Sequence, residues 1–214
     1  MNPKFVLIIT CKIIFLLYLN KLLYINKPIN IPVLTTYVEE FYLRKYPEWD
    51  QIFLNKRKEL YKYFYKTGIK DGQCASPAFD VKYYLENNED LKIALGEFNF
   101  SQAYEHFMEH GKYEGRDLSP VFHLGYYIEN NPDVANIYGN FTDAILDHFL
   151  RHGIHEGRPS SPTFVLEAYK TRNEDLKNAF GDTNIEYYYH YCIHGRIEGR
   201  PAVFENNWLI NNYI

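Results

Sequence analysis

From residue 76 onward, the apolar and polar positions of the chain recur at a fixed interval. The string HFMEHGKYEGR begins at His106, HFLRHGIHEGR at His148 and HYCIHGRIEGR at His190, so each copy starts 42 residues after the one before. A period of this size is typical of arrays of small units, none of which buries its apolar face alone. The pattern predicts three full units, at residues 76–118, 119–160 and 161–202.

Two weaker copies flank the full units. Between residues 37 and 75, YLRKYPEWDQ from Tyr42 matches YYIENNPDVA from Tyr126, and YFYKTGIKDGQ from Tyr63 matches the second histidine string. Near the C-terminus, AVFENNWLINNYI matches the opening of a full unit. We therefore expect a degenerate unit at 37–75 and a partial unit at 203–214.

Capping residues at constant offsets predict three short helices in each full unit. Ser is a strong N-cap and Pro suits the first helical turn, so the first helix is expected to open at Ser-Pro. These openings are Ser76, Ser119 and Ser161. An inward face is indicated by three residue pairs at i and i+4. They are Phe79 with Tyr83, Phe122 with Tyr126, and Phe164 with Ala168.

The second and third helices are predicted from Asn and Gly. An Asn N-cap followed by acidic residues would begin the second helix, at Asn88, Asn131 and Asn173. A glycine would end it, at Gly96, Gly139 and Gly181. The third helix carries the histidines and would end at a left-handed glycine, at Gly111, Gly153 and Gly195.

These elements together indicate an all-α fold of tandem short-helix repeats behind an N-terminal apolar helix. No segment shows the alternation of apolar and polar residues that is typical of a strand, and no two-residue hairpin turn is present. Hydrophobic residues make up 46% of the chain, which is ordinary for a globular protein and argues against disorder.

The N-terminal segment 1–36 has a different character. Phe5 to Ile25 is apolar except for Lys12, Asn20 and Lys21, and it is long enough to cross a membrane. Lys12 would cost about 2.5–3.5 kcal/mol at mid-depth. An uncleaved anchor is favoured over a cleaved signal peptide, because no small residue marks a cleavage site; a buried helix is the remaining alternative. We expect a membrane-anchored or secreted protein, whose orientation the flanking lysines do not fix.

The charge distribution bears on the choice of partner. Residues 1–36 carry +4, and because the whole chain carries −4, the rest carries −8. An acidic body argues against nucleic acid as a partner. A membrane, contacted through residues 5–25, and a glycan or protein are the expected partners.

Each full unit carries two histidines at i and i+4, on one face of a helix. The pairs are His106 with His110, His148 with His152, and His190 with His194. A nearby acid would complete a metal triad, namely Glu114, Glu156 or Glu198. However, the glycine ends the predicted helix before the acid, and the degenerate unit has Tyr63 and Thr67 instead of the histidines. Packing is therefore the favoured role, with metal binding and catalysis as alternatives, and no cofactor is expected.

The acids just named each precede an arginine by two residues, and these arginines are Arg116, Arg158 and Arg200. One interpretation is a recurring ligand clamp. The favoured interpretation is structural: the arginine ties one unit to the next through carbonyls or through the acid of the Asn-X-Asp cap.

Asn99-Phe-Ser and Asn140-Phe-Thr match the pattern of a glycosylation acceptor. Helix capping by the same residues is the favoured alternative. Three cysteines without a recurring pair imply no disulfide framework, and Cys192 is expected in the core. Neither an Asp-X-Asp, a P-loop nor a Gly-X-Ser-X-Gly motif is present, so we expect a non-catalytic protein.

The residues Asn131-Pro132-Asp133-Val134 and HFLRHGIHEGR give a long joint pattern. It resembles a repeat found beside bacterial glycosyltransferase domains and in large secreted or hemolysin-type calcium-binding proteins. The resemblance covers residues 76–202 and, more faintly, 37–73. It implies a non-catalytic binding or scaffold module in a secretory or cell-surface setting, with a link to glycans. An accessory or truncated part of a glycosyltransferase is the alternative, and a recurring metal-binding module is a weaker one.

Overall fold

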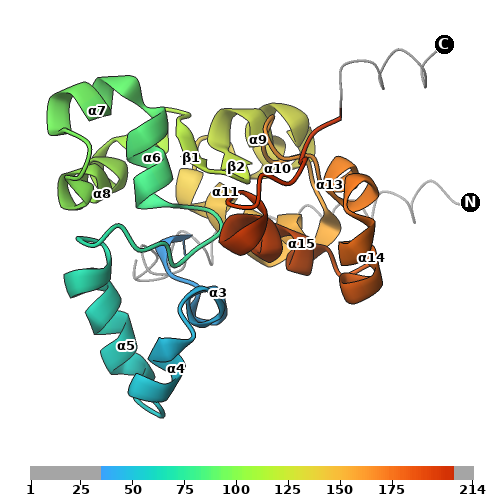
Figure 1. The fold of residues 1–214 in the computed structure, drawn as a ribbon. Coiled ribbons are helices and arrows are strands. Elements are labelled where there is room, and N and C mark those ends of the chain that lie inside the picture. The colour runs from blue at the N-terminus through green and yellow to red at the C-terminus, as the bar shows by residue number, and fades with distance from the viewer. Residues whose placement is uncertain (1–34, 205–214) are drawn as a thin grey trace, which may run out of the picture.

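The computed structural model of this chain describes residues 35–204, and in them the fold is mostly helical, as predicted (Figure 1). We call residues 37–75, 76–118, 119–160 and 161–202 units 1 to 4. The α-helices are α3 (Glu39–Lys45), α4 (Glu48–Ile52) and α5 (Arg57–Tyr63) in unit 1, α6 (Val81–Asn87), α7 (Glu89–Leu95) and α8 (Phe100–Glu109) in unit 2, α9 (Leu124–Asn130), α10 (Pro132–Tyr138), α11 (Thr142–His148) and α12 (Ile154–Glu156) in unit 3, and α13 (Leu166–Arg172), α14 (Glu174–Phe180) and α15 (Asn184–His190) in unit 4.

The third helix of each unit ends in a turn of different pitch. In units 1, 3 and 4 it continues into a π-helical turn, and in unit 2 a short 3₁₀ turn follows it. These turns are η1 (Phe64–Gly68), η2 (Gly111–Tyr113), η3 (Phe149–Gly153) and η4 (Tyr191–Gly195). Two short antiparallel strands, β1 (Asp117–Ser119) and β2 (Phe122–His123), join units 2 and 3; the sequence did not predict them.

The first helix of each full unit begins five residues after the serine of the predicted Ser-Pro start. Asp80 caps α6 instead, since its Oδ1 accepts from the backbone N–H of Lys82 at 3.0 Å. Ser119 is buried, and its Oγ donates to the carbonyl of Pro77 in the preceding unit at 2.6 Å. The prediction that Ser-Pro caps a helix is therefore wrong, because the hydroxyl is used to join units.

Three aromatic side chains fill the centre of each full unit. In unit 2, the ring centroid of Phe79 lies 4.0 Å from that of Phe107 and 5.5 Å from that of Tyr84. Tyr127 and Tyr169 occupy the place of Tyr84, and all three are fully buried. The partner thus lies at i+5, and the predicted pairing at i+4 is wrong, because the first aromatic residue precedes the helix.

The glycines divide into two kinds. Gly96, Gly139 and Gly181 end the second helices, as predicted, and each has a positive φ. Gly153, at the end of the third helix, has a φ of −55°, so the predicted left-handed conformation is wrong. No positive φ occurs at Gly111 or Gly195 either. The left-handed residue is instead the second glycine of the motif, with φ between 66 and 68° at Gly72, Gly115, Gly157 and Gly199.

Each unit is closed by a hydrogen bond between its two ends. The backbone N–H of His123 donates to the carbonyl of Ser160 at 2.8 Å, and the equivalent bond in unit 1 joins Val38 to Ala75 at 2.6 Å. Counted from these bonds, Tyr42 is equivalent to Tyr127. The predicted match of Tyr42 to Tyr126 is therefore wrong by one residue.

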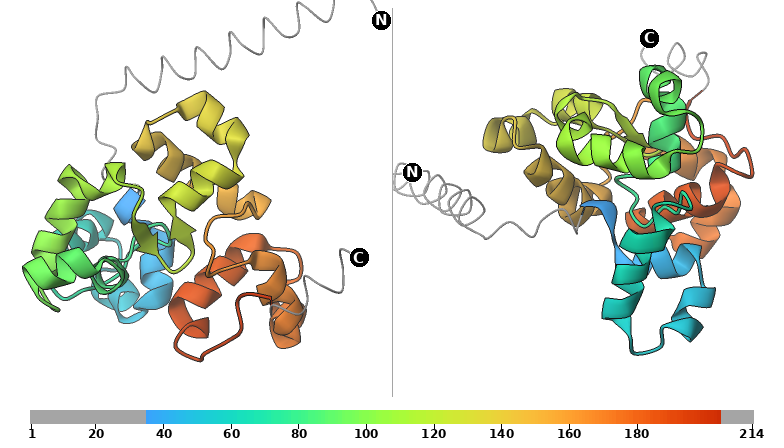
Figure 2. Two further views of the ribbon diagram at one scale, coloured as in Figure 1. Left: turned by 90° about the horizontal axis from the view of Figure 1, so that it is seen from above. Right: turned by 90° about the vertical axis from the view of Figure 1, so that its left-hand side faces the viewer.

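The four units do not form an open line, because unit 4 packs against unit 1. Arg44 Nη1 lies 2.7 Å from Glu186 Oε2, and the rings of Phe41 and Tyr189 meet edge to face at 5.1 Å. One cluster of buried residues runs from Phe41 to Ala202, and Figure 2 shows the four groups of helices gathered round a common centre.

Unit 4 also touches unit 2. The Arg196 guanidinium lies 4.9 Å from the ring centroid of Tyr83, and its Nη2 lies 3.7 Å from Glu86 Oε2. The predicted apolar segment 5–25 and nearly all of the predicted partial unit 203–214 lie outside the described residues.

Candidate functional site

The first histidine of each pair bonds to a buried tyrosine of the same unit. The hydroxyl of Tyr127, on α9, lies 2.9 Å from Nδ1 of His148, at the end of α11. The same contact measures 2.9 Å between Tyr84 and His106 and 2.8 Å between Tyr169 and His190. The tyrosine therefore fixes the orientation of each half-buried imidazole.

The second histidine of each pair is exposed one helical turn further on. Its ring centroid lies 5.4 Å from that of the first histidine in unit 3 and 5.6 Å away in units 2 and 4. The prediction that both rings share a face is confirmed by these distances. These exposed residues are His110, His152 and His194.

The half-buried imidazoles favour the neutral form. Burial lowers the pKa of His148, and the charges of Arg158 and His152 lower it further, while Glu156 and Asp133 act in the opposite direction. Burial likewise lowers the pKa of His106 and His190. These side chains are therefore mostly neutral at pH 7.

A tyrosine hydroxyl explains why a glycine follows each histidine pair. A Cβ at Gly153 would overlap the hydroxyl of Tyr127, although the backbone there is ordinary right-handed helix. Gly111 and Gly195 have the same relation to Tyr84 and Tyr169. The glycine is needed for close approach rather than for backbone freedom.

The recurring arginine joins the end of its unit to the start of the second helix. Arg158 Nε lies 2.5 Å from Glu156 Oε2, and its Nη1 lies 2.8 Å from Asp133. The same pairs recur for Arg116, with Glu114 and Asp90, and for Arg200, with Glu198 and Asp175. The predicted tie to the acid of the cap is present, but it lies within one unit and not between two.

The cap asparagine belongs to the same cluster. Asn131 is buried, and its Nδ2 donates to the carbonyls of Tyr127 at 2.8 Å and Pro159 at 2.9 Å. Its Oδ1 accepts from Arg158 at 3.3 Å. Asn131 stands at the N-cap position of α10, as Asn88 and Asn173 do for α7 and α14, so the predicted start of the second helices is confirmed. The side chain makes no bond to that helix, so only the predicted side-chain cap is wrong. The local sequence pattern could not predict the bond to the carbonyl of Pro159, because only the folded chain brings that carbonyl close to Asn131.

The arginine holds its acidic partners ionised. Hydrogen bonding to Arg116 lowers the pKa of Asp90 to about 2, and Arg158 likewise lowers the pKa of Glu156. In unit 1, Gln73 replaces the arginine and accepts a hydrogen bond from Tyr42. In each full unit, the glutamate and arginine of the candidate clamp are thus hydrogen-bonded to each other.

No group of three or more His, Cys, Asp or Glu side chains in residues 35–204 is arranged to hold a metal ion. Cys74 and Cys192 are buried free thiols, and burial raises the pKa of Cys192 to about 12. Neither thiol is activated as a nucleophile at neutral pH.

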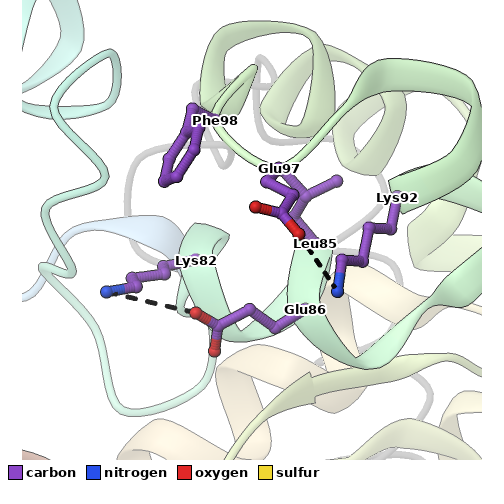
Figure 3. Close-up of a pocket in the computed structure, with 6 residues that line it drawn as sticks. All are labelled: Lys82, Leu85, Glu86, Lys92, Glu97 and Phe98. Atoms are coloured by element: carbon purple, nitrogen blue, oxygen red, sulfur yellow. Dashed lines mark ion pairs between the residues drawn. The ribbon is translucent and has the colours of Figure 1, made fainter.

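An open hollow of about 250 Å³ lies beside α6 and α7 in unit 2 (Figure 3). Lys82 and Glu86 form an ion pair of 4.0 Å on one side, and Lys92 and Glu97 form one of 3.6 Å on the other. Phe98 lines the hollow with 78% of its surface exposed. Sequence reasoning missed this hollow, although unit 2 is one residue longer than units 3 and 4 in this region.

The two glycosylation patterns differ in their surroundings. Asn99 caps α8, as its Oδ1 accepts from the backbone N–H of Gln102 at 3.4 Å and its Nδ2 donates to the Gln102 side chain. Asn140 is exposed in the loop before α11, and the Asn140 side chain makes no hydrogen bond within the part of the chain described. Capping thus accounts for Asn99 and not for Asn140.

Between residues 35 and 204, no helix is both long and apolar enough to span a bilayer. Comparison with known proteins adds no relative: no protein-family model matches the chain, and neither a curated protein nor a solved structure shows significant similarity to it.

Proposed function

We propose that residues 37–204 form a non-catalytic repeat module that binds or scaffolds a partner in a secretory or cell-surface setting. The proposal is supported chiefly by how the recurring polar residues are used. The Asn, Asp, Glu and Arg of each full unit bond to one another within the unit, as Asn131, Asp133, Glu156 and Arg158 do. They therefore hold the fold together, and recognition falls to surfaces that differ between units.

The hollow in unit 2 is the surface that best fits this role. Its two lysines and two glutamates cancel in charge, and they offer both donors and acceptors around an exposed aromatic ring. A neutral, hydroxyl-rich ligand such as a glycan suits this combination, because an aromatic face can cover the apolar face of a sugar ring. We therefore propose a glycan as the ligand of this hollow.

Binding of the full chain to a glycan array tests the proposal. We expect binding that Phe98→Ala abolishes and that Phe141→Ala leaves unchanged, since Phe141 is an exposed aromatic of unit 3 outside the hollow. A blank array, or binding that Phe98→Ala does not weaken, would reject the glycan.

We further propose that residues 5–25 tether the module to a membrane, as their apolar length suggests. Full-length protein should then stay with the membrane fraction at alkaline pH. Its release into the soluble fraction would contradict the tether and leave the binding proposal untouched.

A further inference from the structure

We propose that the histidine pairs of units 2, 3 and 4 are three equivalent sites for a divalent first-row transition ion such as Zn²⁺. The proposal goes beyond glycan binding and does not depend on it. Each site uses two imidazoles one helical turn apart. The pairs are His106 with His110, His148 with His152, and His190 with His194.

The first imidazole of each pair is prepared for ligation. In unit 3, Nδ1 of His148 lies 2.9 Å from the Tyr127 hydroxyl. In the tautomer that binds a metal, Nδ1 carries the proton and donates it to that oxygen, and Nε2 is the nitrogen that ligates. His148 is only partly buried, and no hydrogen bond to its Nε2 is present among residues 35–204. A ligand histidine is commonly held in this way through its second nitrogen.

Packing fixes the same ring from a second direction. The centroid of Tyr138, on α10, lies 5.9 Å from that of His148, and Phe180 lies 5.6 Å from His190 in unit 4. These imidazoles therefore lose little freedom when an ion binds.

The second imidazole lies at a workable distance. Two imidazoles that bind one ion through Nε2 at about 2.0–2.1 Å have ring centroids roughly 4.5–5.5 Å apart. The observed separation is at the upper end of this range in unit 3, at 5.4 Å, and just beyond it in units 2 and 4, at 5.6 Å. Because the second histidine is exposed, a small rotation of its side chain completes the chelate. Two histidines at i and i+4 on a helix are also the pair used by helical zinc proteases.

The charge around each pair is mixed. In unit 3, Asp133 and Glu156 are two carboxylates near the pair, and both bond to the guanidinium of Arg158, whose effect on His148 is the larger. The arginine retains the Glu156 carboxylate at Nε, so water completes the coordination shell. Each site is therefore open and holds its ion less tightly than a closed site with four protein ligands.

Unit 1 provides an internal control. Tyr63 and Thr67 stand in place of the two histidines, while Tyr42 and Gly68 retain the equivalent tyrosine and glycine. The same helical framework thus occurs once without imidazoles. If the shared helical framework bound the ion, all four units would bind one or none would. If the histidine pairs bind it, only units 2, 3 and 4 should.

Calorimetric titration of the full chain with ZnCl₂ tests the proposal. We expect saturation near three ions per chain, one for each histidine pair. His110→Gln, His152→Gln and His194→Gln should each remove one ion, and the triple variant should remove all three. These side chains are exposed, so circular dichroism should show an unchanged fold. Acidification should also release the ions, because protons compete for the same nitrogens.

His155→Gln is the matched control, because His155 is an exposed histidine of unit 3 outside the pair. It should leave the stoichiometry at three. Two results would overturn the proposal: no saturable binding by the wild-type chain, or binding by the triple variant equal to that of the wild type.

Discussion

Gly153 shows how a contact between distant residues selects an amino acid. Its backbone is right-handed helix, where alanine is normally favoured over glycine by about 1 kcal/mol. The added Cβ would, however, meet the hydroxyl of Tyr127. The outcome depends on one oxygen atom of a residue 26 positions earlier in the chain.

We predict that Gly153→Ala lowers the free energy of unfolding by about 1–3 kcal/mol, as expected for overpacking. In a Tyr127→Phe background the same substitution should cost much less, because the oxygen is gone. Urea unfolding of the two single variants and the double variant gives the coupling energy. Additive effects would show that the hydroxyl does not select the glycine.

The half-buried histidines make the fold sensitive to acid. Since the pKa of His106, His148 and His190 is lowered on folding, the unfolded chain binds protons first as the pH falls. Their contribution is complete above the unfolded pKa of about 6.5 and is lost as the pH falls from there toward the folded pKa. The paired acids, such as Asp90, lose their contribution only at lower pH, because their unfolded pKa is about 4.

Thermal melts in metal-free buffer should therefore show a lower melting temperature at about pH 5.5 than at about pH 7.5. His148→Gln should reduce this difference, because glutamine does not titrate. A melting temperature that rises over the same interval would contradict the proposed histidine environment.

At the scale of the element, local patterns predicted the second helices well and the start of the first helices poorly. The second helices end where glycine predicts, at Gly96, Gly139 and Gly181, because that signal acts within the helix itself. Ser119 and Asn131 have the chemistry of N-caps, yet their side chains bond to carbonyls 42 and 28 residues away along the chain. Such partners become available only after the chain has folded, so no local pattern identifies them.

The candidate site was predictable to a similar extent. Spacing alone predicted that the rings of His148 and His152 share one face of a helix, which the structure confirms. The constant offset of Glu156 and Arg158 in each unit also identified them as a recurring pair. The Tyr127 hydroxyl beneath the imidazole was not predicted, because its helix is joined to α11 only by tertiary packing. The hollow beside Phe98 depends on one additional residue before the third helix, and a comparison of unit lengths could have found it.

The arginine cluster should act as a clasp within each unit. Arg158→Lys keeps the charge but loses the planar fork that reaches Glu156, Asp133 and Asn131 together. We predict a loss of about 1 kcal/mol, a modest value because the cluster is partly exposed to solvent. Hydrogen exchange should become faster at residues 153–160 than at the equivalent residues of unit 4.

Arg151→Lys is the control for that variant, since Arg151 makes a single pair with Asp147 one turn away on the surface. Its effect should stay below about 0.5 kcal/mol. Equal losses for the two variants would argue against a clasp.

At the scale of the whole molecule, the main departure from expectation is closure. A linear repeat array holds each unit only against its neighbours. Here Arg44 of unit 1 pairs with Glu186 of unit 4, and Lys45 Nζ donates to the carbonyl of Cys192 at 3.1 Å. Sequence periodicity describes the single unit and the spacing of its copies. It contains no information on how the first copy meets the last, because that depends on small rotations accumulated between units.

Closure implies that units 1 and 4 support each other through the shared core. Phe41 is fully buried against Tyr189, and through Phe41 and Cys74 unit 1 joins the buried cluster of units 2 to 4. The other buried apolar residues of unit 1 form a second cluster, namely Tyr37, Tyr42, Leu60, Phe64, Ile69 and Ala75. Because Phe41 links the two, we expect the described region to unfold in a single transition rather than unit by unit.

Paramagnetic relaxation measured by NMR tests closure most directly. A spin label attached at Glu40→Cys, an exposed position of α3, would be read out in a chain that also carries Cys11→Ser, since Cys74 and Cys192 are buried. The account predicts strong broadening of the α15 amides of Glu186 and Tyr189, 146 and 149 residues away in sequence. Broadening limited to unit 1 and its neighbour unit 2, with the α15 amides unaffected, would contradict it.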